Sequence, residues 1–231
     1  MLKKLYDKNE LWFALLFIFL YCVTTIPVRG ELGDGSIWML VATLVVAILT
    51  VIFIKRYKLE DKYGLNRLPK NIKRYLYFIP LIILATCNFW GGFKAQHEGL
   101  SLLYALLSMI LIGWIEEIIF RGFLFKAIEK RKGLKVAIII SSVTFGIGHI
   151  LNLVSQPSFE TFLQVIYAIA FGFMFVYVFL KTKSLWPCII LHSVIDFTAM
   201  LQGDHMNTIA ATIFIIVICT LYTLYLRKLK D

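Results

Sequence analysis

The sequence contains few charged side chains for its length. Only 16% of its 231 residues are Asp, Glu, Lys or Arg, and 60% are hydrophobic, whereas ordinary soluble domains hold about 25% charged and about 45–50% apolar residues. The mean hydropathy is +0.81. This composition excludes a soluble globular enzyme, and the aliphatic and aromatic excess excludes a disordered chain.

Several signatures of small secreted or cofactor-dependent proteins are also missing. The four cysteines form no closely spaced pair, which excludes a disulfide framework and a cysteine metal site, so we interpret them as packing or lipid-facing residues. They are Cys22, Cys87, Cys188 and Cys219. The sequence has no HExxH motif, no phosphate loop, no dinucleotide fingerprint and no repeated block.

Long apolar stretches dominate what is present. Each is close to the ~17–25 residues that cross ~30 Å of hydrocarbon as an α-helix. The eight stretches lie at about 11–28, 37–54, 75–90, 100–120, 135–152, 161–180, 184–200 and 207–226. They are apolar all round, unlike the ~10-residue alternation of a membrane barrel. We therefore predict an all-α, polytopic membrane protein of about eight transmembrane helices, forming a single integral membrane domain over residues 1–231.

The basic residues are concentrated in alternate connections between these stretches. All but Arg29 and Lys94 of the 24 lysines and arginines lie near the N-terminus, within 55–74, within 121–135, at 181–183 or in the C-terminal tail. By the positive-inside rule this alternation predicts cytoplasmic termini and a multi-pass protein of the cell membrane. The net charge of +10 is then a topology signal, with the lipid bilayer and no nucleic acid as partner.

The fourth stretch ends with two adjacent carboxylates inside a hydrophobic run, where an ionisable residue costs ~2.5–3.5 kcal/mol on insertion scales. Glu117 and Arg121 are four residues apart, share a helix face and can pair. Glu116 is rotated about 100° away and has no partner in its own helix. We assign Glu116 to chemistry, as a general base, and Glu117 with Arg121 to its support. The alternative is that the pair only marks a helix end.

Chain geometry places His149 at the depth of Glu116. Gly133 is the first clear helix breaker after this stretch, and Glu116 and His149 both lie ~25 Å along a helix from it, on opposite sides. Small residues on the second helix permit close helix approach. They are Ser141, Ser142, Gly146 and Gly148.

A second histidine and an aspartate reach a similar depth from another direction. His192 and Asp196 lie ~14 Å and ~20 Å beyond Lys183, and their four-residue spacing puts them on one helix face. Together with Glu116 and His149 they form a cluster that can perform acid–base chemistry on water, hold a metal or pass protons.

Three motifs therefore occur in order on separate apolar stretches. They are Glu116-Glu117 with Arg121 (EExxxR), Phe145 with His149 (FxxxH), and His192 with Asp196 (HxxxN or its Asp form). This ordered set resembles the CPBP family, the CAAX protease and bacteriocin-processing or abortive-infection group of intramembrane proteases. The resemblance covers residues 110–200, which we predict to be the catalytic core.

The resemblance implies an eight-helix membrane protease, with relatives that cut prenylated CAAX proteins or are linked to bacteriocin self-immunity and peptide maturation. It also implies that Glu116 and His149 activate the water, while His192 and its four-residue partner stabilise the oxyanion. The residues predicted to support the site are Glu117, Arg121 and Phe145.

Asp196 departs from the family pattern, in which Asn is common. Because an ionised Asp repels an oxyanion, Asp196 must be protonated, orient His192 or bind a metal. Zinc and a metal-free glutamate mechanism both remain open, since Glu116, His149 and His192 would furnish three ligands and leave a fourth position for water.

We therefore expect an intramembrane endopeptidase, glutamate- or metal-dependent, whose cavity opens toward the cytoplasmic half and whose substrate is a small peptide or membrane-anchored polypeptide. The rival function is a non-catalytic bacteriocin immunity protein or a proton-coupled transporter that uses the same cluster. A transporter typically has paired Gly/Pro-interrupted segments in its two halves, and the sequence shows none.

Overall fold

Helices account for the regular structure of the chain. The computed structural model describes residues 2–69, 78–155, 158–203, 205 and 207–229. Within these ranges it contains no strand, and one isolated bridge joins Phe93 to Gln202. The predicted all-α class is confirmed.

Six described helices are long and apolar enough to cross a bilayer, which makes the chain a polytopic, multi-pass membrane protein. They are α2 (Glu10–Leu32), α3 (Ile37–Arg56), the continuous helix Gly99–Lys132, the helix Leu134–Leu151, α9 (Phe159–Thr182) and α11 (Thr208–Lys228).

Two of the eight predicted spans take a shorter form. The seventh is α10 (Trp186–Ala199), an apolar helix of 14 residues. The third contains α4 (Ile79–Ala85) and η2 (Cys87–Phe89), and its residues 75–77 lie outside the described ranges. The number of spans therefore stays a prediction. The remaining short helices are α1 (Leu2–Lys8) and α8 (Asn152–Ser155).

The fourth span is one helical path with a π-helical centre. α5 (Gly99–Glu117) continues into the π-helix η3 (Ile118–Leu124) and then into α6 (Phe125–Lys132). At 1.5 Å per residue the path measures roughly 50 Å, which is longer than the ~30 Å thickness of the hydrocarbon core. The chain then turns at Gly133, whose φ of 82° favours glycine, into α7 (Leu134–Gly148). The predicted turn at Gly133 is confirmed.

The π-helical segment is buried along its whole length and is hydrogen-bonded to α7. All seven of its residues are buried. The Ser141 hydroxyl donates to the Phe120 carbonyl at 2.8 Å, which satisfies a backbone oxygen inside the wide π turn. Such π-helical turns are rare and occur frequently at functional sites.

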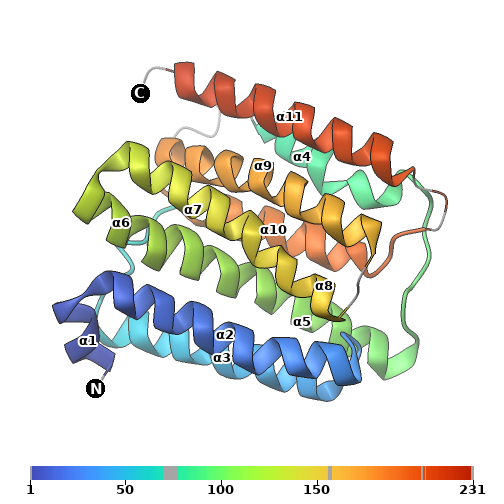
Figure 1. Ribbon diagram of the computed structural model, residues 1–231, viewed down its shortest axis with the longest axis horizontal. Helices are drawn as coiled ribbons and strands as arrows, with labels where there is room; N and C mark the ends of the chain where they lie inside the picture. Colours follow the sequence, from blue (N-terminus) through green and yellow to red (C-terminus); the bar gives the residue numbers. More distant parts are fainter. Residues whose placement is uncertain (1, 70–77, 156–157, 204, 206, 230–231) are drawn as a thin grey trace.

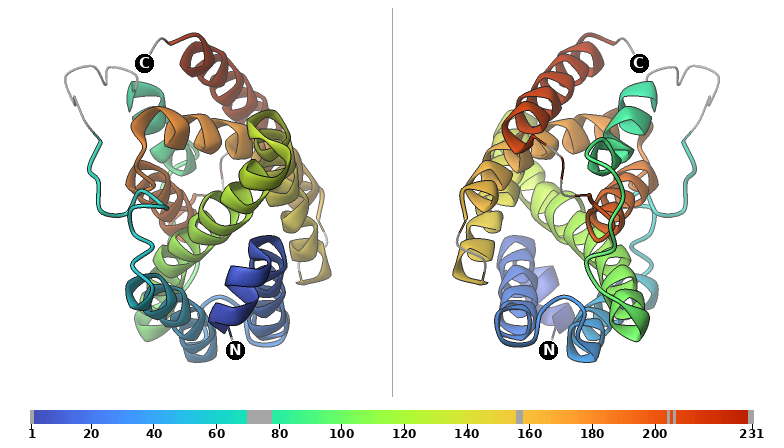
Figure 2. Two further views of the ribbon diagram at one scale, coloured as in Figure 1. Left: turned by 90° about the vertical axis from the view of Figure 1, so that its left-hand side faces the viewer. Right: turned by 90° about the vertical axis from the view of Figure 1, so that its right-hand side faces the viewer.

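The helices are arranged as a bundle (Figure 1). In Figure 1, α2 and α3 cover one side and α11 with α4 covers the other, while α5, α7, α9 and α10 lie between them. Within the bundle α7 packs against α9, α10 against α5, and α3 also against α5. Figure 2 shows the same arrangement from its two ends.

Both termini lie at the same end of the bundle (Figure 1). Hydrogen bonds at this end join Lys62 and Lys130 to Glu10, and Ser184 to the Arg67 carbonyl. We call this end, with the loop 57–69 and the turn at Gly133, the basic end. The arrangement is the one that two cytoplasmic termini require, and the side of the membrane stays a prediction.

Two glycines allow the interior helices to approach closely. A Cβ added at Gly113 would lie 2.6 Å from the backbone nitrogen of Ser193 in α10. At Gly146 it would lie 2.6 Å from the backbone nitrogen of Ile169 in α9. These are sub-contact distances, so α5 and α7 meet their neighbours backbone to backbone. The predicted close approach along 141–148 is confirmed at Gly146.

Candidate active site

The predicted site residues come from three separate segments of the interior. They are Glu116 and Glu117 on α5, Arg121 on η3, Phe145 on α7, His149 on η4 (His149–Leu151), and His192 and Asp196 on α10. Contacts between α5 and α10, and between α7 and η3, bring these segments together. Six of the seven side chains are linked by direct contacts around His192, and His149 joins them through Phe145.

The imidazole of His192 is the centre of the cluster. Its Nδ1 lies 2.9 Å from Glu117 Oε1. Its Nε2 lies 3.4 Å from Asp196 Oδ2 and 3.8 Å from Glu116 Oε2. Because a carboxylate oxygen only accepts, Nδ1 donates to Glu117, and Nε2 is left facing the other two carboxyl groups. Three acidic side chains thus surround one histidine.

Glu117 and Arg121 form the predicted ion pair in full burial. Arg121 Nη1 donates to Glu117 Oε1 at 2.9 Å, and both side chains are 0% exposed. The guanidinium carbon lies 3.9 Å from the ring centroid of Phe145 and 5.1 Å from that of Phe175, so two aromatic faces solvate the cation. The same Glu117 oxygen also bonds His192, so the ion pair is directly connected to the histidine.

Glu116 lies in a more open environment and has partners from two other helices. Its side chain is 13% exposed, against 0% for Glu117. The Tyr21 hydroxyl of α2 donates to its Oε1 at 2.7 Å, and its Oε2 faces His192. The two adjacent carboxylates therefore differ in their surroundings: Glu117 is held in a buried ion pair, and Glu116 retains some exposure.

His149 is half-buried and is held by the segment that precedes it. Its Nδ1 lies 3.0 Å from the Phe145 carbonyl oxygen, so Nδ1 carries the proton and Nε2 is the acceptor. The Phe145 ring lies 5.1 Å from the His149 ring and 5.5 Å from the His192 ring. Within the described residues no hydrogen bond joins His149 to Glu116.

The predicted metal ligands do not converge. In the part of the chain that the structure describes, no three His, Cys, Asp or Glu side chains form a group that could hold a metal ion. His192 Nε2 and Glu116 Oε2 face each other at 3.8 Å, and the His149 ring contacts this pair through the ring of Phe145. A three-ligand catalytic site needs its donors aimed at one point.

Two residues at the site were missed by sequence reasoning. Phe175 of α9 stacks on His192, with the two ring centroids 5.6 Å apart. Tyr21 bonds Glu116 from a span with no predicted site residue. The polar side chains just after it, Thr24 and Thr25, interrupt an apolar run and were the available signal.

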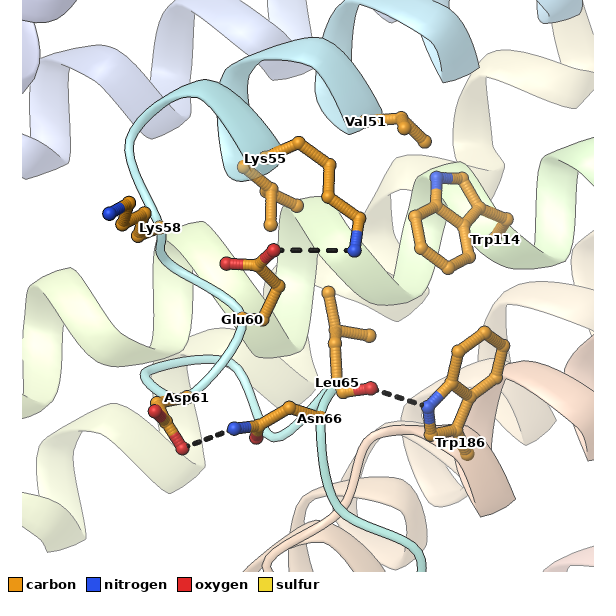
Figure 3. Close-up of a pocket in the computed structure, with 10 residues that line it drawn as sticks. Val51, Lys55, Lys58, Glu60, Asp61, Leu65, Asn66, Trp114 and Trp186 are labelled. Atoms are coloured by element: carbon orange, nitrogen blue, oxygen red, sulfur yellow. Dashed lines mark hydrogen bonds and ion pairs between the residues drawn. The ribbon is translucent and has the colours of Figure 1, made fainter.

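A separate cavity of about 480 Å³ lies toward the basic end (Figure 3). Its walls include Lys55, Glu60, Asp61, Trp114 and Trp186. The amide of Asn66 and the guanidinium of Arg67 hold the pKa of the Asp61 carboxyl below its ordinary value. Trp114 lies two residues before Glu116, about 200° around the helix, and none of the predicted catalytic residues lines this cavity.

Comparison with known families supports the motif assignment. Residues 98–198 match the family described as Type II CAAX prenyl endopeptidase Rce1-like. This range contains all seven predicted site residues, and the predicted resemblance to the CPBP family is confirmed for it. At family level the match supports an endopeptidase. No curated protein matches the chain.

Proposed function

We propose that this protein, whose residues 98–198 match the family described as Type II CAAX prenyl endopeptidase Rce1-like, is an intramembrane endopeptidase with Glu116 as its catalytic base. The observation that carries the proposal is the contrast between the two carboxylates on α5. Glu117 is fully buried and bonded to Arg121 and His192, whereas Glu116 is 13% exposed and presents Oε2 toward His192 Nε2. A base that must reach water needs the second environment.

The proposed reaction begins with a water molecule beside Glu116 Oε2. Glu116 takes one proton from the water, and the hydroxide forms a bond to the carbonyl carbon of the scissile peptide. His149, whose Nε2 is free to accept, holds the second hydrogen of that water. The carbonyl π electrons move to oxygen and give a tetrahedral oxyanion. The proton on Glu116 then passes to the leaving nitrogen as the C–N bond breaks.

His192 is the proposed donor to the oxyanion. Its Nδ1 proton is committed to Glu117, so the oxyanion can be met only by a proton on Nε2. Asp196 Oδ2, one turn along α10 and 3.4 Å from Nε2, favours that protonated form and fixes the ring. Among the three roles that the sequence leaves open for Asp196, the contact supports orientation of His192.

The test uses the purified full-length protein in lipid nanodiscs. Two quenched fluorescent peptides with a C-terminal CAAX sequence serve as substrates, one farnesylated on the cysteine and one unmodified, with mass spectrometry to locate the cut. We expect wild type to cleave at least one of them and Glu116→Gln, which keeps size and polarity but accepts no proton, to lose cleavage at normal expression level.

A parallel comparison of membrane peptide profiles from cells with wild type and Glu116→Gln covers substrates unlike either peptide. Cleavage that survives Glu116→Gln contradicts the proposal. Uptake of intact peptide into vesicles with no hydrolysed product contradicts it in favour of transport.

A further inference from the structure

Tyr21 reaches the proposed catalytic base from a helix outside the family-matched residues 98–198. We propose that Tyr21 is a positioning residue that holds Glu116 in the orientation needed to activate water, so that the catalytic unit of this protein includes α2. The inference rests on the proposed function, because it assigns Tyr21 a task only if Glu116 is the base.

The hydrogen bond selects which carboxylate oxygen is free. The Tyr21 hydroxyl donates to Glu116 Oε1 at 2.7 Å, a short distance of the kind seen when the acceptor is charged. Oε2 lies 3.8 Å from His192 Nε2, beyond hydrogen-bond length, so its lone pairs remain available. One oxygen therefore fixes the group and the other is left to take the proton of water.

The packing of α2 against η3 sets the position of Tyr21 along the helix that carries Glu116. Phe17 lies one turn before Tyr21 on the same helix face, and its ring packs 5.2 Å from that of Phe123 in η3. Phe13, a further turn back, lies 5.0 Å from the same ring. Because α2 and α5–η3 run in opposite directions (Figure 1), this aromatic contact on η3 aligns Tyr21 with Glu116, two turns earlier on α5.

The backbone around Tyr21 is shaped by its own sequence. The Thr25 hydroxyl donates to the Tyr21 carbonyl at 2.7 Å, and the Thr24 hydroxyl donates to the Leu20 carbonyl at 2.8 Å. Pro27 lies inside the helix and supplies no N–H to the Val23 carbonyl. Threonine back-bonding and an internal proline both bend helices. Tyr21 thus lies just before the part of α2 that contains these threonines and the proline, and its carbonyl is bonded by one of them.

The experiment compares four forms of the full chain in nanodiscs: wild type, Tyr21→Phe, Glu116→Gln and Tyr6→Phe. Tyr6→Phe is the matched control, because it also removes a hydrogen-bonded phenol, one that contacts Tyr63 and Lys62 at the basic end. We expect Tyr21→Phe to lower kcat about 10- to 100-fold with KM and the thermal midpoint unchanged, the size expected for a hydrogen bond to a charged group. Tyr6→Phe should keep kcat.

The kcat and KM values come from the farnesylated peptide, or from the peptide identified in the membrane profile. A wild-type kcat in Tyr21→Phe, while Glu116→Gln is inactive, overturns this inference alone. A fall in thermal midpoint that accounts for the lost activity also overturns it, because Tyr21 would then be only structural. Cleavage that survives Glu116→Gln overturns the proposed function and this inference with it.

Discussion

At the scale of the residue, the buried side of the cluster determines how the site is held. Glu117 Oε1 receives both Arg121 and His192, while Glu117 Oε2 and two guanidinium nitrogens have no hydrogen-bond partner among the described residues. The rings of Phe145 and Phe175 cover the guanidinium instead. A buried charge in such a setting depends on its partner, since an unpaired one is costly.

Removal of Arg121 should therefore damage folding before chemistry. Arg121→Met keeps much of the volume and leaves Glu117 buried without its cation, so we expect a loss of about 3–5 kcal/mol in stability. The measurement is the thermal midpoint and expression level in nanodiscs. Arg131→Met, at an exposed arginine on α6, is the control and should change stability by less than about 0.5 kcal/mol. Normal stability of Arg121→Met with lost cleavage would contradict a structural role.

Asp196 separates the metal-free mechanism from a zinc mechanism. If Asp196 orients His192, the amide oxygen of Asp196→Asn can keep the 3.4 Å contact with Nε2, and we expect activity within about tenfold of wild type. Cleavage is measured with and without a chelator, and metal content is measured in both proteins. Stoichiometric zinc that is lost in the variant, together with chelator-sensitive cleavage, would contradict this and favour Asp196 as a ligand.

At the scale of the element, the site depends on the contact between α5 and α10. His192 is adjacent to Ser193, whose backbone lies against Gly113, and the Ser193 hydroxyl donates to the Ile110 carbonyl at 3.0 Å. This contact sets the distance from which His192 reaches Glu117. The position of the histidine is therefore decided by a glycine on the opposite helix.

A methyl group at Gly113 should disturb catalysis through helix spacing. In Gly113→Ala the new Cβ would lie 2.6 Å from the Ser193 nitrogen, so α10 must move away. We expect a stability cost of about 1–3 kcal/mol and, because ~1 Å of misplacement can cost ~100-fold, a larger loss of kcat. Gly122→Ala on the same helical path is the control, since its Cβ would meet Tyr63 at an ordinary 3.5 Å. Equal activity of the two variants would contradict this account.

At the scale of the whole molecule, charge and packing agree on one polar end. Both termini, the loop 57–69 and the turn at Gly133 share the basic end (Figure 1). Glu10 bonds Lys62 and Lys130 there, which ties α2, the loop and α6 together. Three segments far apart in sequence are thus joined at one end of the bundle.

Reporter fusions test that orientation. Fusions after Lys62 and Lys132 should report the cytoplasm, and fusions at Gly33 and Ser155 should report the opposite side, because the positive-inside rule retains the basic end in the cytoplasm. A cytoplasmic signal at Ser155 would contradict the hairpin of the fourth and fifth spans around Gly133.

The class of the protein and the order of its motifs can be predicted from the amino-acid sequence. Composition required a membrane, helical spacing paired Glu117 with Arg121, and a glycine after a long helical pattern placed the turn at Gly133. These features are local or compositional: they depend on 1.5 Å per residue, on i,i+4 contacts and on the cost of apolar surface in water. These features can be predicted without knowing which helices pack against each other.

The contacts between side chains of different helices could not be predicted in this way and are visible only in the folded protein. Tyr21 lies far from Glu116 along the chain, yet its hydroxyl donates a hydrogen bond to Glu116 at 2.7 Å. Glu117 bonds not only to Arg121 of its own helical path but also to His192 of α10. The π-helical turn carrying Arg121 also had no sequence signal. The physical reason is that helix rotation and spacing in a bilayer follow from packing between helices, through contacts such as Gly113 on Ser193, and an apolar run alone does not specify which face turns inward.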